Sequence, residues 1–401
     1  MGFTIYLKNN EERSLRAGYG WVYANEVQRI EGKDKNGSLA TVRTADGRFI
    51  GRGHINHLSK ILVRIFIFND RDDENDVIFS RLLYAAKMRK ELDIGQAYRV
   101  VFAEADLLPG LIVDKFGDCL SVQFLTLGAE LKKQFIVDCL VKIFSPRTIV
   151  ERNDSPVREK EGLKQTKGFL YGKEDARTVI TENSVKVNVD LLNGQKTGYF
   201  LDQKLNRLAI RRYVKNKTVL DCFSNVGGFA LNAALGGAKN VVALDVSPLA
   251  VEEIQKNALL NGFDNVSAVC CDVFDKLREF KAEKRKFDVI VLDPPAFAKS
   301  SDAAPNALKG YKDLNVLAMK LLTEGGILVS SSCSHFVTQA MFTKMLAECA
   351  AETDKAVTVL EEKMQCVDHP YLLAAKETAY LKFYVLKVRS VNAELIGFEK
   401  E

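Results

Sequence analysis

Four aspartates in the second half of the chain stand where apolar, strand-like segments end. They are Asp221, Asp245, Asp272 and Asp293. The carboxyl ends of parallel strands meet at one edge of a sheet, where such sheets bind their ligands, so we expect these carboxylates to share a site. Any one of them could instead serve only as a helix N-cap. Their recurrence at successive strand ends favours a ligand site with several hydrogen-bond acceptors.

The first of these strand ends leads into a turn that lacks the dinucleotide fingerprint. Residues 221–229 read DCFSNVGGF, which is not G-x-G-x-x-G. The glycines that cradle a pyrophosphate are missing, and the carboxylate of Asp221 would repel a phosphate. It could accept a hydrogen bond from a cationic amino acid or from a bound water. The turn therefore favours a nucleoside cofactor without phosphates and disfavours an NAD-dependent dehydrogenase.

The next two acids suit the rest of a nucleoside. Asp245 follows Asp221 by 24 residues, where an acid can accept both ribose hydroxyls. Asp272 could accept from the exocyclic amine of adenine, with apolar neighbours beside the ring. Lys196 and Tyr199 lie in a glycine-bearing segment, residues 193–203, which could cover the cofactor, meet a phosphate or substrate, or only lead into a helix.

The fourth and fifth strand ends carry groups that could act on a planar substrate. Asp293 is followed by Pro294 and Pro295, which hold the backbone extended and rigid, and Phe297 comes two residues later. This turn could present a carboxylate to a nucleobase edge, or it could be a simple strand-ending turn. Cys333 stands at the end of the fifth strand, where a deprotonated thiol is a competent nucleophile.

The other cysteines are expected to be small buried residues, which is also the alternative for Cys333. No CxxC pair occurs among the eight, so we expect no metal site. His335 is expected to be a surface residue.

These candidates fall in a region that alternates strands and helices, which is typical of a doubly wound, mostly parallel α/β sheet. We predict strands at 185–191, 218–222, 240–245, 266–270, 287–292 and 327–332, and helices at 227–236, 249–261 and 338–351.

The first part of the chain reads differently. Strands at 3–7, 21–27, 39–44 and 61–68 predict a small all-β barrel or sandwich. An α+β middle module should follow, with a polar linker at 69–76 and a loop-like stretch at 153–177. Its predicted helices are 77–92 and 130–144, and its predicted strands are 97–104, 111–115, 118–125 and 148–152.

Composition is that of a globular protein. The 401 residues are 47% hydrophobic and 27% charged, which excludes a disordered chain, a collagen and a coiled-coil rod. The net charge is +5, and residues 1–72 hold 12 Lys or Arg against 8 Asp or Glu, so a phosphate-bearing partner is compatible but not required. We expect no membrane-spanning helix, no secretory signal and a cytoplasmic location.

Several motifs together resemble a known family, the bacterial 23S ribosomal RNA 5-methylcytosine methyltransferases with an N-terminal PUA domain. The likeness covers nearly the whole chain. The motifs that carry it are residues 108–117 (LPGLIVDKFG), 158–162 (REKEG), 194–203 (GQKTGYFLDQ), 221–229 (DCFSNVGGF), 293–297 (DPPAF) and 332–334 (SCS).

The resemblance implies a PUA β-barrel that binds RNA (1–72), an α+β middle domain (73–187) and a class I methyltransferase domain that uses S-adenosylmethionine (188–401). It implies that Cys333 is the covalent nucleophile, that Asp293 assists catalysis, and that 23S ribosomal RNA is the partner, with a homodimer as one expected form. The cofactor residues expected on this basis are Tyr199, Asp221, Phe223, Asn225, Gly227, Asp245, Val246, Asp272, Val273 and Asp293, and the substrate residues are Lys196, Pro294, Pro295 and Phe297.

Departures from related groups leave two points open. Tyr19 and Gly20 replace the family's usual His-Pro before Trp21. Ala296 stands where a sister group has a second cysteine, so the group that removes the C5 proton is not identified. An RNA methyltransferase acting on an exocyclic amine of guanine or adenine is one alternative, and a non-catalytic RNA-binding assembly protein is another.

Overall fold

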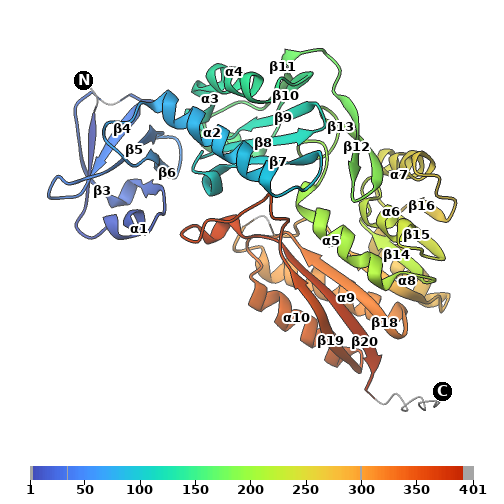
Figure 1. Cartoon of the computed structure of the whole chain (residues 1–401). Helices are drawn as coiled ribbons and strands as arrows, with labels where there is room; N and C mark the ends of the chain where they lie inside the picture. Colours follow the sequence, from blue (N-terminus) through green and yellow to red (C-terminus); the bar gives the residue numbers. More distant parts are fainter. Residues whose placement is uncertain (1–2, 34, 299, 392–401) are drawn as a thin grey trace. The chain divides into compact units, whose positions relative to one another are not determined.

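The computed structural model describes residues 3–33, 35–298 and 300–391, which form two compact units. Among these residues, one unit comprises the chain up to Ile180 with Val189–Asp202 and Val367–Thr378. The other comprises Thr181–Asn188, Gln203–Cys366 and the residues from Ala379 onward. Figure 1 follows the chain by colour. No helix within this described part is long and apolar enough to cross a bilayer.

The first unit begins with a six-stranded, mostly antiparallel sheet in the order β2-β6-β5-β4-β1-β3. Alternate residues of β1 and β4 are buried, including Ile5, Leu7 and Val42, as expected for a sheet with one face on a core. Its elements are β1 (Thr4–Leu7), α1 (Glu12–Arg16), β2 (Trp21–Tyr23), η1 (Ala24–Glu26), β3 (Val27–Glu31), β4 (Leu39–Arg43), β5 (Phe49–Ile55) and β6 (Ile61–Ile67).

Strand β5 is not among the strands expected from the sequence, because its glycines can also indicate turns. A Cβ at Gly53 would come within 2.0 Å of the carbonyl oxygen of Arg64 on β6. Gly53 therefore allows the two strands to approach closely, which is the other common role of glycine in a strand.

A five-stranded sheet follows in the same unit, in the order β11-β10-β9-β8-β7. Helices α2 and α4 share its apolar core. Asp73 caps α2 by accepting from the backbone N–H groups of Asn75 and Asp76, at 2.8 and 3.3 Å. The elements are α2 (Glu74–Glu91), β7 (Ala97–Phe102), η2 (Ala103–Asp106), β8 (Leu111–Phe116), β9 (Cys119–Phe124), α3 (Leu127–Leu131), α4 (Lys133–Phe144), β10 (Thr148–Asn153), η3 (Pro156–Glu161) and β11 (Thr166–Gly172).

The prediction of a loop over 153–177 is wrong in part, since this stretch contains η3 and β11. Strand β11 pairs with β10 at the edge of the sheet and is largely exposed. An exposed edge strand does not need alternating apolar residues, so the sequence pattern did not reveal it. The neighbouring hairpin of β12 (Arg177–Glu182) and β13 (Val185–Asp190) also contains one unexpected strand, β12.

The second unit is built on a seven-stranded sheet in the order β16-β15-β14-β17-β18-β20-β19. The first five strands are parallel, as predicted, and β20 and β19 are antiparallel to them. Its strands are β14 (Thr218–Cys222), β15 (Asn240–Asp245), β16 (Val266–Cys270), β17 (Phe287–Leu292), β18 (Leu322–Ser332), β19 (Lys355–Lys363) and β20 (Lys382–Ser390).

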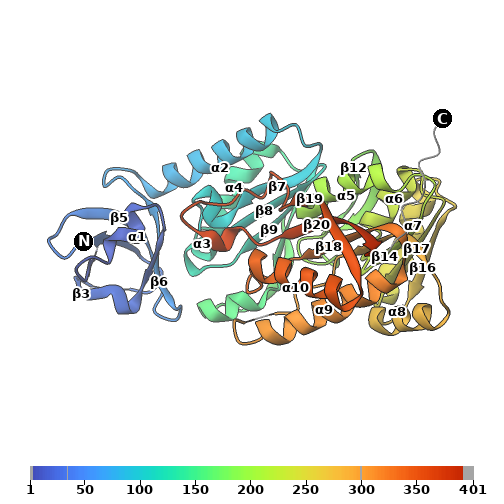
Figure 2. The same cartoon turned by 90° about the horizontal axis from the view of Figure 1, so that it is seen from below.

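Helices cover both faces of this sheet, and α9 and α10 lie side by side (Figure 2). The other elements of this unit are α5 (Lys204–Ala209), η5 (Ile210–Tyr213), α6 (Gly228–Leu235), α7 (Pro248–Leu260), α8 (Val273–Ala282), α9 (Ala304–Leu321) and α10 (Gln339–Glu352). The short helix η6 (Lys376–Thr378) belongs to the first unit, and η4 (Leu201–Gln203) lies at the boundary between the units in sequence.

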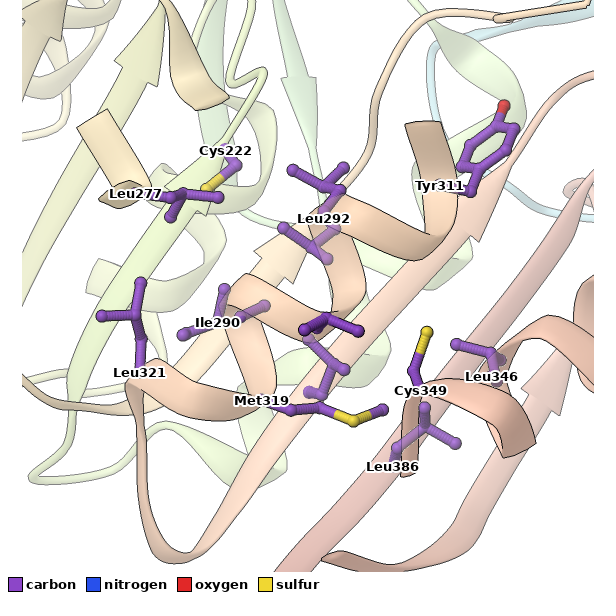
Figure 3. Packing of buried hydrophobic residues seen from close by; sticks show 14 of the residues in the cluster. Cys222, Leu277, Ile290, Leu292, Tyr311, Met319, Leu321, Leu346, Cys349 and Leu386 are labelled. Atoms are coloured by element: carbon purple, nitrogen blue, oxygen red, sulfur yellow. The ribbon is translucent and has the colours of Figure 1, made fainter. Parts of the chain in front are cut away.

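Successive residues of the central strands enter two different cores. Leu220, Ile290 and Leu328 belong to one core, and their neighbours Val219, Val289 and Val329 belong to the other. Figure 3 shows the first core, where side chains of the central strands meet those of the flanking helices. Burial on both faces explains why these strands are largely apolar in sequence. The same packing holds in place the carboxyl ends of the strands, where the candidate site residues lie.

Candidate active site

The carboxyl ends of the parallel strands bring several of the expected groups to one edge of the second unit. Asp221, Asp245 and Asp293 end or follow β14, β15 and β17, and Cys333 follows β18. Strand β14 lies between β15 and β17, and β18 lies beside β17. Burial raises the pKa of Asp221, and the nearby carboxylates of Asp293 and Asp245 add to that rise.

Asp221 is the most buried of these acids, with 1% of its surface exposed. Its Oδ2 accepts from the Ser224 hydroxyl at 2.5 Å and from the backbone N–H of Ala230 at 2.9 Å. The second contact satisfies a free donor in the first turn of α6, so the capping role considered from sequence is real. Its Oδ1 is buried and has no hydrogen-bond partner among the described residues. That oxygen suits a cationic ligand group, since an unpaired buried acceptor is costly.

Asp221→Asn is expected to remove a pH-dependent loss of stability. Burial raises the pKa of Asp221 to about 7 from an ordinary 3.8. The folded protein keeps a proton that the unfolded chain releases between these values, so this group lowers the free energy of unfolding as pH rises from about 4 to 7. At about 1.4 kcal/mol per tenfold change in proton affinity, the loss is of the order of a few kcal/mol.

Urea unfolding at several pH values checks this. The asparagine variant should gain stability relative to the native protein as the pH rises from 4 to 8, because asparagine does not ionise. A stability difference that stays constant over this range would mean that the native carboxyl does not keep its proton on folding.

The turn after β14 has the backbone needed to approach a ligand. Phe223, Asn225 and Gly227 all have left-handed φ values of 63°, 53° and 92°. The backbone N–H of Asn225 donates to Asp245 at 2.8 Å, so the turn is tied to the end of β15. Two non-glycine residues in this conformation are uncommon and indicate a constrained turn.

Asp245 has both carboxylate oxygens engaged but is only half-buried. Oδ2 accepts from Asn225, and Oδ1 accepts from the backbone N–H of Ser247 at 2.9 Å. Each oxygen has a second lone pair, so the carboxylate can still accept from a pair of hydroxyls. Val246 is 69% exposed and presents an apolar side chain beside it.

The side chains of Asp272 and Val273 have structural contacts, one as a helix cap and the other in the core. Asp272 is exposed and caps α8 by accepting from the backbone N–H of Asp275 at 3.1 Å. The side chain of Val273 is 3% exposed and packs in the core. The capping alternative is therefore realised at Asp272, and any contact of Val273 with a ligand would need its backbone.

Asp293 is oriented by two side chains that lie far away in sequence. Its Oδ1 accepts from Gln203 Nε2 at 2.8 Å and from the Ser331 hydroxyl at 2.5 Å. The Ser331 hydroxyl also lies 3.2 Å from the carbonyl oxygen of Leu292, so it connects the ends of β17 and β18. Cys333 follows two residues later and is half-buried. Of the other seven cysteines, five are buried as expected, but the expectation is wrong for the exposed Cys270 and the half-buried Cys271.

The residues after Asp293 differ in exposure. Pro294 is buried and Pro295 is exposed, while the half-buried Phe297 packs on Tyr311 with ring centroids 4.6 Å apart. Pro295 and the neighbouring Ala296, which is also exposed, are therefore the members of this turn open to a substrate. His335, as expected, is exposed, and its ring lies 5.2 Å from that of Tyr380.

Lys196 and Tyr199 lie in the first compact unit. Tyr199 is buried, and Lys196 has a left-handed φ of 57° with its Nζ 5.9 Å from the ring centroid of Phe200. Thr197 between them donates to Asp114 of β8 at 2.6 Å, which anchors the segment. Their roles toward cofactor and substrate stay predictions.

Sequence reasoning missed four contributors to this edge. Gln203 and Ser331 orient Asp293, Ser224 holds Asp221, and Lys382 of β20 donates to the carbonyl oxygen of Ser334 at 2.6 Å. Gln203 and the serines carry side chains too common to stand out. Lys382 lies on a strand that was not predicted.

The site fits a nucleoside that carries an amino acid. The unpartnered oxygen of Asp221 suits an ammonium group, the half-buried Asp245 suits a ribose, and the concentration of carboxylates disfavours phosphates.

Comparison with known proteins is consistent with this chemistry. Residues 5–68 match the PUA-like domain family, and residues 164–381 match the S-adenosylmethionine-dependent methyltransferase family. The ribosomal RNA large subunit methyltransferase I of Aliivibrio fischeri is 40% identical over 395 residues, covering 97% of this chain and 100% of the relative. The protein of the same name from Aeromonas salmonicida is 41% identical over 397 residues, with the same coverage.

Two solved structures share the fold. One is SMU.776 in complex with SAH, and the other is described as a SAM-dependent methyltransferase from Streptococcus mutans. Their TM-scores are 0.83 and 0.81 at 21% identity, and each comparison covers 96% of this chain and 100% of the other. The expected fold class is confirmed: a PUA half-barrel, a middle module of strands and helices, and a mostly parallel Rossmann-like methyltransferase sheet.

Proposed function

The chain belongs to the ribosomal RNA large subunit methyltransferase I family, a PUA-containing family that depends on S-adenosylmethionine, and we propose that it forms 5-methylcytidine in 23S ribosomal RNA through a covalent bond between Cys333 and cytosine C6. Support comes above all from Cys333 and Asp293, which stand at adjacent strand ends joined by the hydroxyl of Ser331. A methyltransferase that acts on an exocyclic amine needs no thiol at this position.

The chemistry follows from the weak nucleophilicity of cytosine C5. S-adenosylmethionine, when bound, supplies an electrophilic methyl group. The thiolate of Cys333 adds to C6, which makes C5 an enamine carbon able to accept that methyl group. Asp293 holds N3 and stabilises the charge that develops on the ring. Loss of the C5 proton then allows Cys333 to leave.

We assign the cofactor to the edge of the second unit. Asp221 binds the amino group of the methionine part of the cofactor through its unpartnered oxygen. The turn that contains Phe223, Asn225 and Gly227 lies along the same methionine part. Asp245 receives the ribose hydroxyls. The remaining expected contacts are Val246, Asp272 and Val273 on the adenine side, and Asp293 and Tyr199.

Contacts to the base are assigned to the rigid turn after β17. Pro295 is an exposed residue of that turn, Pro294 is buried and Phe297 is half-buried. All three are proposed to contact the base, and Lys196 is proposed to meet the RNA. A target base in a stacked RNA must be extruded or already unpaired before Cys333 can reach C6.

The N-terminal module is proposed to bind structured RNA. Residues 1–72 carry 12 Lys or Arg against 8 Asp or Glu, which suits a phosphate backbone. We propose domain limits of 1–72, 73–187 and 188–401, of which residues 1–2, 34, 299 and 392–401 lie outside the described part. A cytoplasmic location and a homodimer are also proposed, and sedimentation would test the latter.

The function is tested by incubating the protein with unmodified 23S RNA and labelled S-adenosylmethionine, followed by nucleoside mass spectrometry. We expect labelled 5-methylcytidine. A labelled N2-methylguanosine or N6-methyladenosine would establish the exocyclic-amine alternative. Failure to bind S-adenosylmethionine in a calorimetric titration would instead favour a non-catalytic assembly protein.

A further inference from the structure

Lys382 is a buried lysine on the strand beside the one that leads to Cys333. Strand β20 is antiparallel to β18, and Lys382 lies opposite Ser332 in the register. Only 9% of Lys382 is exposed. Its Nζ donates to the carbonyl oxygens of Ser334 at 2.6 Å and Tyr380 at 2.8 Å. The first of these carbonyls belongs to the residue after Cys333, so the amine is held at the backbone beside Cys333 and interacts electrostatically with its thiol.

This lysine has no carboxylate to balance its charge. Among the described residues its two carbonyl contacts are its hydrogen bonds, and it forms no ion pair with an acid. A buried cation without a counter-ion is unfavourable. Burial accordingly lowers the pKa of Lys382 to about 8, and the nearby thiolate of Cys333 opposes that decrease. Among the described residues, Cys333 is the group whose negative charge would favour the protonated form of this lysine.

The hydrogen bonds of Lys382 are compatible with gain or loss of one proton. A neutral amine has two N–H donors and one lone pair, and an ammonium has three donors. The two carbonyls take two donors in either state. The third position can hold a lone pair or a proton, and no existing hydrogen bond is broken when it changes.

We propose that Lys382 acts through Cys333, as the residue that takes the proton of the thiol and then stabilises the thiolate. The Sγ–H bond breaks, its electron pair stays on sulfur, and the proton joins the lone pair of Nζ. The product is a thiolate beside an ammonium with no change in total charge. This role rests on the proposed function of Cys333 as the nucleophile, and it makes Lys382 a positioning residue for that nucleophile.

Other titratable groups near Cys333 do not offer the same exchange. Tyr311 of α9 interacts electrostatically with Cys333, but burial raises the pKa of its phenol, so it stays neutral. Asp293 is a hydrogen-bond acceptor for Gln203 and Ser331. His335 is exposed, with its ring against Tyr380. Lys382 is the cation that β20 brings within electrostatic reach of the thiol.

The test measures alkylation of Cys333 by iodoacetamide as a function of pH, with the modified peptide quantified by mass spectrometry. The native protein should show a Cys333 thiol pKa clearly below the ordinary value of about 8.5. Lys382→Met should slow alkylation at pH 7 about tenfold or more and move the profile to higher pH. Lys387→Met is the matched control, since Lys387 is an exposed lysine on the same strand and loses the same charge. The exposed Cys270 serves as an internal reference whose rate should not change.

Several results would overturn the proposal. One is a native Cys333 profile centred at or above 8.5, which needs no variant. Another is a folded Lys382→Met protein with the native profile, or an equal effect of Lys387→Met. If Lys382→Met does not fold, Lys382→Arg keeps a cation that can stabilise the thiolate, although a guanidinium cannot take the proton of the thiol. It should alkylate Cys333 within a few-fold of the native rate at pH 7, and a tenfold loss in a folded Arg variant would count against the proposal.

Alkylation requires neither RNA nor cofactor, so this experiment is separate from the methylation assay. A native-like profile in Lys382→Met would remove the role of Lys382 while the formation of 5-methylcytidine could still be observed. If the methylation assay gave a methylated purine, Cys333 would have no role in catalysis. This would hold even if the alkylation profile showed that Lys382 lowers the pKa of the Cys333 thiol.

Discussion

Cys333→Ala is expected to lower the rate of methyl transfer by about 10⁴-fold or more, because removal of a covalent nucleophile eliminates the step that activates the substrate. Without a sulfur–C6 bond, cytosine C5 has too little electron density to accept a methyl group. Single-turnover transfer of label from S-adenosylmethionine to unmodified 23S RNA measures this directly. Cys333→Ser should be almost as inactive, because an alcohol is far less ionised than a thiol near neutral pH.

The controls separate chemistry from folding and binding. Cys333 is half-buried at a strand end, so its truncation to alanine should change the melting temperature little. The affinity for S-adenosylmethionine, measured by calorimetry, should stay within a few-fold of native. Cys270→Ala removes an exposed thiol at the end of β16 and should leave transfer unchanged. Normal turnover by Cys333→Ala would refute the covalent mechanism and make Cys333 a packing residue.

The parallel strands were predictable because burial on both faces leaves a strong trace in sequence. Val289 and Ile290 of β17 enter opposite cores, so a polar residue at either position would be unfavourable, and residues 289–292 read as a continuous apolar run. The strand ends were visible for the same reason, since the acids mark where that run stops. The grouping of Asp221, Asp245, Asp293 and Cys333 at one edge follows from parallel topology alone.

Strands at edges were harder to predict. β11 and β19 are mostly exposed or half-exposed, so they carry polar residues without a strict pattern. β5 contains glycines that read as turns, although Gly53 is required by the close approach of Arg64. These strands are determined by partners far away in sequence, and a local window contains no information about such partners.

Side chains that hold the acids were also invisible. Gln203 reaches Asp293 across 90 positions, and Lys382 lies opposite Ser332 only because β20 returns antiparallel to β18. Polar residues of these types are common on surfaces, so their identity carries no signal. By contrast, the cap formed by Asp272 shows that an acid at a strand end can have a structural partner as well as a predicted ligand role.

Asp293→Asn is expected to lower kcat about 10²- to 10³-fold with little change in stability, because it alters one functional atom and keeps the shape of the side chain. The amide oxygen can still accept from Gln203 Nε2 and from the Ser331 hydroxyl, so the side chain should keep its orientation. What is lost is the ability of the second oxygen to carry a proton to or from N3 as charge builds on the ring.

Gln203→Ala distinguishes loss of this chemistry from loss of orientation. It removes one of the two donors to Asp293 and leaves the carboxyl in place, so we expect a smaller decrease in kcat, about tenfold. Combined with Asp293→Asn, it should add little further loss, because the two side chains act as one unit and their effects are not additive. If Asp293→Asn and the native enzyme had equal kcat, Asp293 would not be the group that holds cytosine N3. A multiplicative double variant would mean that Gln203 acts on the substrate independently, not through the carboxyl of Asp293.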